Sequence, residues 1–254
     1  MQALHTVGMK KNILSFLILA ILSGCATAQN EYDPLEGMNR KTDHFNDVVD
    51  RATLKPIALG YQAIASEPTR GLVSNFFDNA TYLNTVLNDF LQGKVKQGFS
   101  DTTRFMINST LGFAGIADVA TSLGFEKHNE DLGQTLAVWG VGKSAYIEYP
   151  LLGPNSLRNT PDFITASATD VTFWLFLITT PQVTIPLTVM KYIDLRSRVM
   201  GATDMRDEVA LDPYVFTREA WRQHRDYVIY DGHPPVPQTS TGSQDDWSED
   251  DFGD

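Results

Sequence analysis

Apolar residues recur at steps of three and four over residues 72–91, a spacing that places side chains on one face of a helix. Gly93 follows, in the position that glycine commonly takes just beyond a helix C-terminus. A second helix is expected over residues 97–111, ending at Gly112 and Gly115. The first stripe consists of Leu72, Val73, Phe76, Phe77, Leu83, Val86, Leu87, Phe90 and Leu91.

The C-terminal half continues the helical pattern. Asp212 directly before Pro213 combines a capping acid with a first-turn proline, which predicts a helix over residues 214–230. Before it, a stripe over residues 189–200 is expected to end at Gly201. Its members are Val189, Tyr192, Ile193, Arg196, Val199 and Met200.

The glycine-rich centre departs from this pattern. Residues 134–142 and 145–152 are expected to form a short hairpin or an extended loop. The predicted fold is therefore mainly all-α, with a small hairpin or irregular insertion.

Residues 171–190 contain no charge, between Asp170 and Lys191. Their length suits a transmembrane helix, but Pro181 and Pro186 are expected to break one. A buried helix hairpin is a second interpretation. We favour a third, a bent apolar element whose tryptophan-containing half enters one leaflet without crossing the bilayer.

The N-terminus has the layout of a secretory signal: Lys10 and Lys11, then an apolar stretch over residues 13–22, then small residues. Leu22-Ser23-Gly24-Cys25 resembles the bacterial lipobox, in which the thiol receives diacylglycerol and the new amine is acylated. The alternative is an ordinary signal that happens to end near a cysteine. Translation could also begin at Met9 rather than Met1.

Acylation of Cys25 would anchor the chain stably, because two or more buried fatty chains hold a protein to a bilayer. Ala26 and Thr27 follow, and the absence of an aspartate there favours the outer membrane over the inner one. Cys25 is the only cysteine, which excludes disulfides and cysteine-bound metals within one mature chain.

Composition and charge limit the domain organisation of the chain and the classes of partner that it can bind. The formal net charge is −11 over 254 residues, with no basic stripe, which argues against nucleic acid as a partner. Prolines from Pro234 precede a tail rich in acids and free of bases, which is expected to be disordered. The predicted organisation is a signal peptide over 1–24, a lipidated linker over 25–32, a helical domain over 33–233 and the acidic tail over 234–254.

Many short motifs in one order resemble the MlaA (VacJ) family of outer-membrane lipoproteins. Met38 and Asn159 depart from it, and Asn159 puts in doubt an Arg–Asp pair at its turn. The matching segments are Asp33-Pro34-Leu35-Glu36-Gly37, Asn39-Arg40, Phe45-Asn46, Lys55-Pro56, Ser74-Asn75-Phe76, Asn88 to Gly93, Arg104-Phe105, Asn108 to Gly112, Asp118-Val119-Ala120, Glu130 to Leu136, Trp139 to Gly142, Pro150 to Pro154, Asp212-Pro213-Tyr214 and Arg218-Glu219-Ala220.

The resemblance implies a ring of amphipathic helices in the inner leaflet of the outer membrane, facing the periplasm. Such a ring encloses an amphipathic channel through which misplaced phospholipids leave the outer leaflet. The lipids pass to the periplasmic carrier MlaC, and family members associate with trimeric porins. Maintenance of outer-membrane lipid asymmetry is the implied function.

Four side chains are candidate contacts with lipid. Arg104 and Arg158 could bind lipid phosphates, because guanidinium groups bind them bidentately, although salt bridges explain both equally well. Trp139 and Trp174 either mark the membrane interface or fill a core.

No enzymatic motif is found. The chain has no Gly-x-Ser-x-Gly nucleophile elbow and no phosphate-binding loop, so neither an enzyme nor a cofactor is predicted. The segment around His128, Glu130 and Asp131, like His44, is interpreted as polar surface rather than a metal site. An enzyme acting on envelope lipids and a porin-binding tether remain the alternatives to lipid transport.

Overall fold

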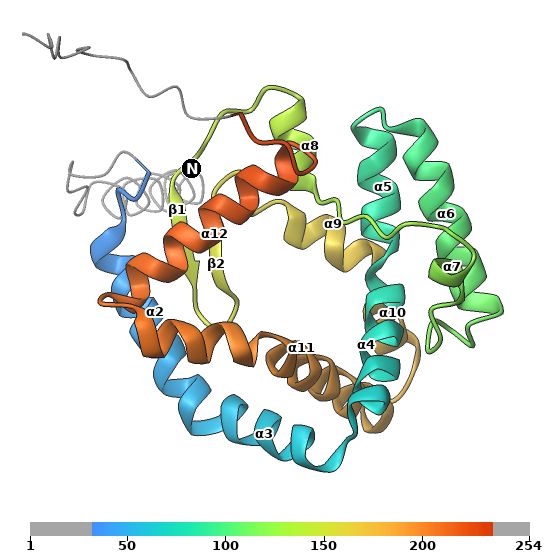
Figure 1. Ribbon diagram of the computed structural model, residues 1–254, viewed down its shortest axis with the longest axis horizontal. Coiled ribbons are helices and arrows are strands. Elements are labelled where there is room, and N and C mark those ends of the chain that lie inside the picture. Colours follow the sequence, from blue (N-terminus) through green and yellow to red (C-terminus); the bar gives the residue numbers. More distant parts are fainter. Residues whose placement is uncertain (1–31, 236–254) are drawn as a thin grey trace, which may run out of the picture.

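The computed structural model describes residues 32–235, whose helices are arranged in a ring (Figure 1). The predicted signal peptide, Cys25 and nearly all of the acidic tail lie outside these residues. In chain order the elements are α2 (Glu36–Val49), the π-helix η1 (Asp50–Leu54), α3 (Lys55–Ile64), α4 (Glu67–Thr81), α5 (Leu83–Leu91), α6 (Val95–Thr110), α7 (Val119–Ser122), α8 (Leu132–Val138), β1 (Tyr146–Tyr149), β2 (Gly153–Ser156), α9 (Asp162–Thr169), α10 (Val171–Ile178), α11 (Pro181–Val209) and α12 (Pro213–Ile229).

The mainly helical fold class is confirmed, and so are the predicted helices at α6 and α12. The Asp212 carboxylate caps α12 by accepting a hydrogen bond from the backbone N–H of Val215 at 3.2 Å. The stripe over 72–91 divides into α4 and α5, because the N–H of Tyr82 bonds to Asn79 O, three residues back, and interrupts the helical ladder.

Two glycines of the predicted helix ends behave differently. Gly93 follows α5 with φ +78°, the left-handed conformation that ends a helix without strain. Gly201 keeps helical backbone, and α11 continues to Val209, so the predicted end at Gly201 is wrong. Glycine ends a helix only where its backbone actually turns left-handed.

The uncharged segment over 171–190 forms α10 and the first turns of α11. The expected bend before Pro181 is confirmed, but Pro186 lies inside α11, so the break predicted there is wrong. Pro186 removes a single hydrogen bond close to the helix start, and the long helix tolerates that loss. Within residues 32–235, none of the helices combines the length and the apolarity needed to cross a bilayer.

The two-stranded hairpin pairs Tyr146 with Ser156 and Tyr149 with Gly153, antiparallel. Residues 134–142 take no part in it, contrary to the sequence expectation. Asp131 caps a helix there instead, because its carboxylate accepts the Gln134 backbone N–H at 2.9 Å.

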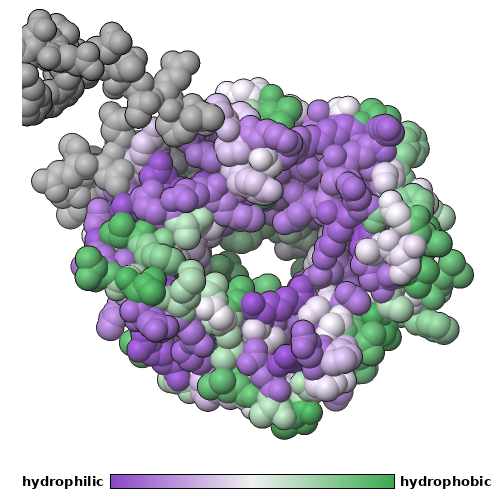
Figure 2. Space-filling model, viewed as in Figure 1, coloured by the Kyte–Doolittle hydropathy of each residue, from purple (hydrophilic) through white to green (hydrophobic). Residues whose placement is uncertain are grey.

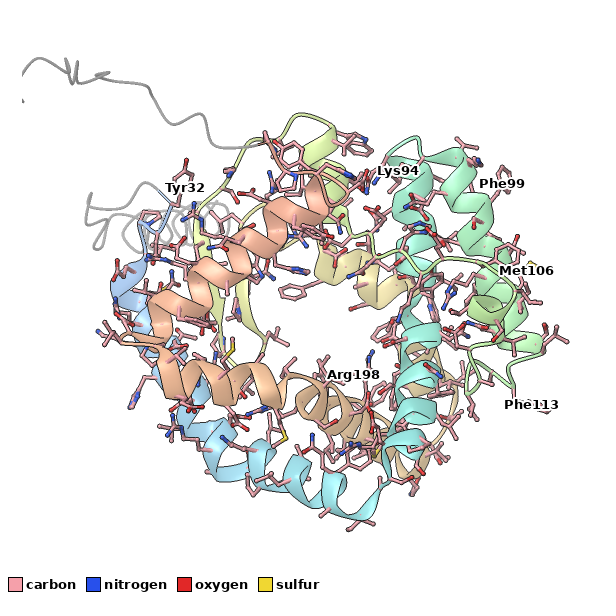
Figure 3. The ribbon with its side chains drawn as sticks, in the orientation of Figure 1. Tyr32, Lys94, Phe99, Met106, Phe113 and Arg198 are labelled. Atoms are coloured by element: carbon pink, nitrogen blue, oxygen red, sulfur yellow. The ribbon has the colours of Figure 1, made fainter. Side chains whose placement is uncertain are left out.

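Burial is inverted relative to an ordinary soluble domain. Among residues 32–235, 21 polar or charged side chains are buried against eight hydrophobic ones, while many large apolar side chains are exposed. Phe99, Met106 and Phe113 point away from the ring (Figure 3). The exposed residues of α10 include Phe173, Trp174, Phe176, Leu177 and Ile178, so a buried helix hairpin is the wrong interpretation of this segment. Entry of α10 into one leaflet stays a prediction.

Candidate functional site

The central opening passes through the ring and is visible in the space-filling view (Figure 2). On one side it adjoins a cavity of 510 Å³, hereafter the inner cavity, into whose region Arg198 points (Figure 3). The inner cavity is lined by Asp78, Thr81, Tyr82, Asn84, Thr85, Lys127, His128, Asn129, Glu130, Asp131, Asp162, Ala166 and Arg198. Its wall is therefore polar and charged.

Ion pairs hold the cations of this wall in place. Asp78 accepts hydrogen bonds from Lys127 Nζ and Arg198 Nη1, each at 2.6 Å. Burial opposes ionisation of Asp78, but the hydrogen bonds from the two cations outweigh it and lower its pKa. Arg198 also donates to Asp194 through Nε at 2.8 Å, and Ser74 donates to the same carboxylate at 2.9 Å. The network ties α4 to α11 beside the opening.

The apolar side chains near the opening line a second cavity. Leu151 and Leu152, at the tip of the hairpin, line this groove of 370 Å³ together with Tyr192, Leu195 and Val199 of α11. Charged side chains also line it: Asp43, Asp47, Asp50, Glu148, Arg196 and Arg206. Figure 2 shows hydrophobic residues on one side of the opening and hydrophilic residues on the other. The opening is thus amphipathic, with one wall suited to hydrocarbon and the other to charged groups.

The ring is closed by a buried cluster, hereafter the clasp, that joins the N-terminal segment to α12. The buried Asp33 carboxylate accepts hydrogen bonds from Asn39 Nδ2 at 2.8 Å, from the Tyr214 hydroxyl at 2.5 Å and from Arg218 Nη1 at 2.9 Å. Burial and the bond to Asp33 raise the pKa of Tyr214, so its hydroxyl stays a donor.

A second contact supports the clasp from the surface. Arg40 of α2 donates to both carboxylate oxygens of Asp212, at 3.2 and 2.9 Å, and to Glu36 at 2.7 Å. Such bidentate pairs are stronger and more directional than single ion pairs. The two ends of the described chain are therefore joined by charged contacts rather than by an apolar core.

A pair of buried carboxyl groups lies between α5 and α6. Asp89 and Asp101 are both fully buried, and Gln97 Nε2 donates to Asp89 at 2.7 Å. The pKa of Asp89 is raised to about 8. Burial is the largest cause, and the neighbouring Asp101 is the next. Asp101 faces the Tyr82 hydroxyl and His128 Nδ1, each at 3.0 Å. The protonated form of Asp89 is therefore favoured at neutral pH.

Replacing Asp89 by asparagine is expected to change the pH dependence of stability. The folded protein holds the Asp89 proton up to about pH 8, whereas the unfolded chain releases it near the ordinary value of 3.8. Between these values, this site's contribution to the free energy of unfolding falls as pH rises, by up to about 1.4 kcal/mol per pH unit. Asparagine keeps the shape without the titration, so its advantage over wild type should grow from pH 5 to pH 8.

Thermal unfolding midpoints in one detergent, measured at pH 5, 6.5 and 8, check this expectation. Glu208→Gln, which changes an exposed acid of α11, serves as the control and should follow wild type at every pH. A constant difference between Asp89→Asn and wild type across this range would contradict the assignment.

Arg104 is only 3% exposed and is bonded to groups inside the protein. Its guanidinium donates to Asp118 at 2.6 Å, to Thr121 at 2.9 Å and to the backbone oxygen of Phe125 at 2.5 Å. The salt bridge that was the alternative for Arg104 is therefore present. Its contact with a lipid phosphate stays a prediction, one that these internal bonds do not favour.

Arg158 has a different environment. Its Nη1 donates to the backbone oxygens of Val141 and Gly142, while its buried Nε has no hydrogen-bond partner in the described chain. Burial and then the charge of Arg225 lower its pKa. Asn159 directs its side-chain amide at Arg225 rather than pairing with Arg158. The contact of Arg158 with a lipid head group stays a prediction.

The two tryptophans do not fill a core. Trp139 is 58% exposed and Trp174 52% exposed. Their indole N–H groups donate to the backbone oxygens of Leu91 at 3.0 Å and Ala168 at 2.8 Å. The core-filling alternative is wrong for both, and a place at the membrane interface stays a prediction.

The loop around His128 is polar, as expected. His128 faces Asp101, and Glu130 accepts hydrogen bonds from Lys94 and Gln92, each at 2.8 Å. Within residues 32–235, no three His, Cys, Asp or Glu side chains are grouped so that they could hold a metal ion.

A family model described as MlaA lipoprotein matches residues 31–228, nearly the whole of the described chain. The chain belongs to the MlaA lipoprotein family. The intermembrane phospholipid transport system lipoprotein MlaA of Escherichia coli (strain K12) is 31% identical over 236 residues, which cover 88% of this chain and 90% of the relative. The lipoprotein of the same description from Haemophilus influenzae is 28% identical over 236 residues, covering 87% and 92% of the two chains.

A solved structure described as the structural basis for maintenance of bacterial outer membrane lipid asymmetry has the same fold. It superposes with a TM-score of 0.66 at 28% identity and covers 78% of this chain and 98% of the solved one. The mainly helical ring is therefore shared with this solved structure.

The sequence motifs contain the residues of the clasp, but they do not identify all the residues of the inner cavity. Asp33, Asn39, Tyr214 and Arg218 all belong to quoted motifs, and the structure brings them together in the clasp. Asp162 was missed by sequence reasoning. The one available signal was an acid directly after Pro161 at a helix start, which is common at ordinary helix N-termini.

Proposed function

We propose that this chain is an outer-membrane lipoprotein that removes misplaced phospholipids from the outer leaflet and so maintains lipid asymmetry. The observation that carries the proposal is the amphipathic opening inside a ring that exposes many large apolar side chains. A phospholipid has the same division, with a charged head group and hydrocarbon chains.

The opening would lower the barrier to lipid movement. Moving a charged head group through hydrocarbon is costly unless polar groups replace its lost water. The inner cavity supplies such groups on one side, and the groove beside Leu151 and Leu152 receives acyl chains on the other. Non-helical backbone at membrane depth is tolerable where it lines a wet cavity, as the loop at 127–131 does here.

The finer parts of the proposal rest on the family. The chain would sit in the inner leaflet of the outer membrane, facing the periplasm and held by the acylated Cys25. It would pass lipid to the carrier MlaC and associate with a trimeric porin. The process is transport rather than enzymatic chemistry and uses no cofactor besides the acyl chains.

Deletion of the gene is expected to raise the phospholipid content of the outer leaflet, as measured by surface acyl labelling. Re-expression of the wild-type chain should clear this lipid. Cys25→Ala should not, because the chain would lose the anchor that holds it at the membrane.

The controls separate this proposal from a tether function. Immunoblots of membrane fractions confirm that each chain is made and where it lies. A normal outer leaflet in the deletion strain, together with stable porin association of the wild-type chain, would favour a tether and refute lipid removal.

A further inference from the structure

Asp162 is the one acid of the inner cavity that lacks a cation. In the described chain, Asp78 pairs with Lys127 and Arg198, Glu130 with Lys94, and Asp131 with Arg225. Among residues 32–235, no lysine, arginine or histidine lies within ion-pair distance of Asp162. The cavity wall therefore keeps one uncompensated negative charge.

The hydrogen bonds of Asp162 all converge on one oxygen. Asn84 Nδ2, the Leu132 backbone N–H and Thr165 Oγ1 donate to Oδ1 at 3.1, 2.9 and 3.0 Å. No donor from the described chain is bonded to Oδ2. The side chain is thus held in one orientation by α5, α8 and α9, with an acceptor oxygen to spare.

The same cavity contains a partly free cation. The Lys127 ammonium carries three N–H donors, and it uses one of them on Asp78. Lys127 is about half exposed, so its remaining donors are open to the cavity. The volume of 510 Å³ is in the range of sites that bind small molecules.

We infer that the inner cavity is a head-group subsite for zwitterionic phospholipids with a primary ammonium group. Asp162 Oδ2 accepts a hydrogen bond from the ammonium, and Lys127 donates to the phosphate. Anionic phospholipids offer no cation to Asp162 and leave its charge unpaired, so they bind less well. This inference rests on the proposed function and adds to it the class of lipid.

The test uses the full-length acylated protein in detergent. The protein is mixed with vesicles containing equal amounts of dioleoyl phosphatidylethanolamine, phosphatidylcholine and phosphatidylglycerol and is then re-isolated. Bound lipids are quantified by mass spectrometry. Wild type should enrich phosphatidylethanolamine over phosphatidylglycerol about tenfold, the size expected for one charge-assisted hydrogen bond. Phosphatidylcholine should lie between them, because it keeps the positive charge but has no ammonium N–H.

Asp162→Asn isolates the charge. Asparagine retains an acceptor for the three donors at Oδ1, so the local fold should persist, and circular dichroism checks it. The enrichment should disappear in Asp162→Asn and persist in Glu208→Gln, the matched loss of an exposed acid on α11.

Each outcome has a distinct meaning. Binding of the three lipids in vesicle proportion by wild type would overturn the head-group inference and leave lipid transport standing. Persistence of the enrichment in folded Asp162→Asn would also overturn it. If wild type bound no phospholipid of any kind, the proposed function would fail together with the inference.

Discussion

Arg218→Ala is expected to lower the free energy of unfolding by about 3–5 kcal/mol, because it leaves the buried Asp33 carboxylate without its cation. Asn39 and Tyr214 would still donate to Asp33, but two neutral hydrogen bonds do not replace a charge. The loss acts where the N-terminal segment meets α12, so the ring should open at the clasp. A fall of roughly 10 °C in the thermal midpoint is expected in the same detergent.

Arg51→Ala is the matched control. Arg51 is exposed and pairs with Asp47 at 2.9 Å, one turn away on the same helical path. Exposed pairs of this kind contribute about 0–1 kcal/mol. Similar small changes in both variants would show that the clasp does not hold the ring together.

Ala166→Trp is expected to block lipid clearance, leaving outer-leaflet phospholipid as high as in the deletion strain. Ala166 lies on α9 and lines the inner cavity. An indole side chain, which covers about 150–250 Å² when buried, would occupy much of that space. The helix itself should persist, because tryptophan is tolerated in helices at a cost below about 1 kcal/mol.

Ala168→Trp makes the same change at an exposed position two residues further along α9. Since successive residues of a helix are rotated by about 100°, position 168 faces away from position 166. Surface acyl labelling of strains expressing each variant, with immunoblots of the outer-membrane fraction, gives the comparison. Full clearance by a normally expressed Ala166→Trp would mean that lipid does not pass through this cavity.

Local signals explain what could be read from the sequence in advance. The Asp212-Pro213 start of α12 and the glycine end after Leu91 depend on residues within one or two turns, and both were predicted correctly. The prediction at Gly201 failed although the residue type is the same. Backbone conformation at a glycine depends on whether packing favours continuing the helix, and α11 continues with Met200 buried beside Gly201.

The polarity of the helix faces could not be assigned from periodicity. A stripe of apolar residues normally marks the face that packs inward, yet here Leu72, Leu87 and Phe90 are exposed while Asn88 and Asp89 are buried. A pattern of period 3.6 distinguishes two faces of a helix, but it does not show which face is buried and which is exposed. Polar side chains are buried in place of apolar ones because, inside the ring, they form hydrogen bonds and ion pairs with one another.

The sequence by itself determined the helical class, the helical segments of α4 to α6 and of α12, the family and the predicted anchor at Cys25, because these depend on local spacing or on motifs in a fixed order. The tertiary structure decided which side chains meet. Arg218 and Asp33 are separated by 185 positions. Asp162 of α9, Lys127 of the loop before α8 and Arg198 of α11 line one cavity only because the tertiary structure brings these segments together. Helical periodicity carries no information over such separations, since it reaches only a few residues along the chain.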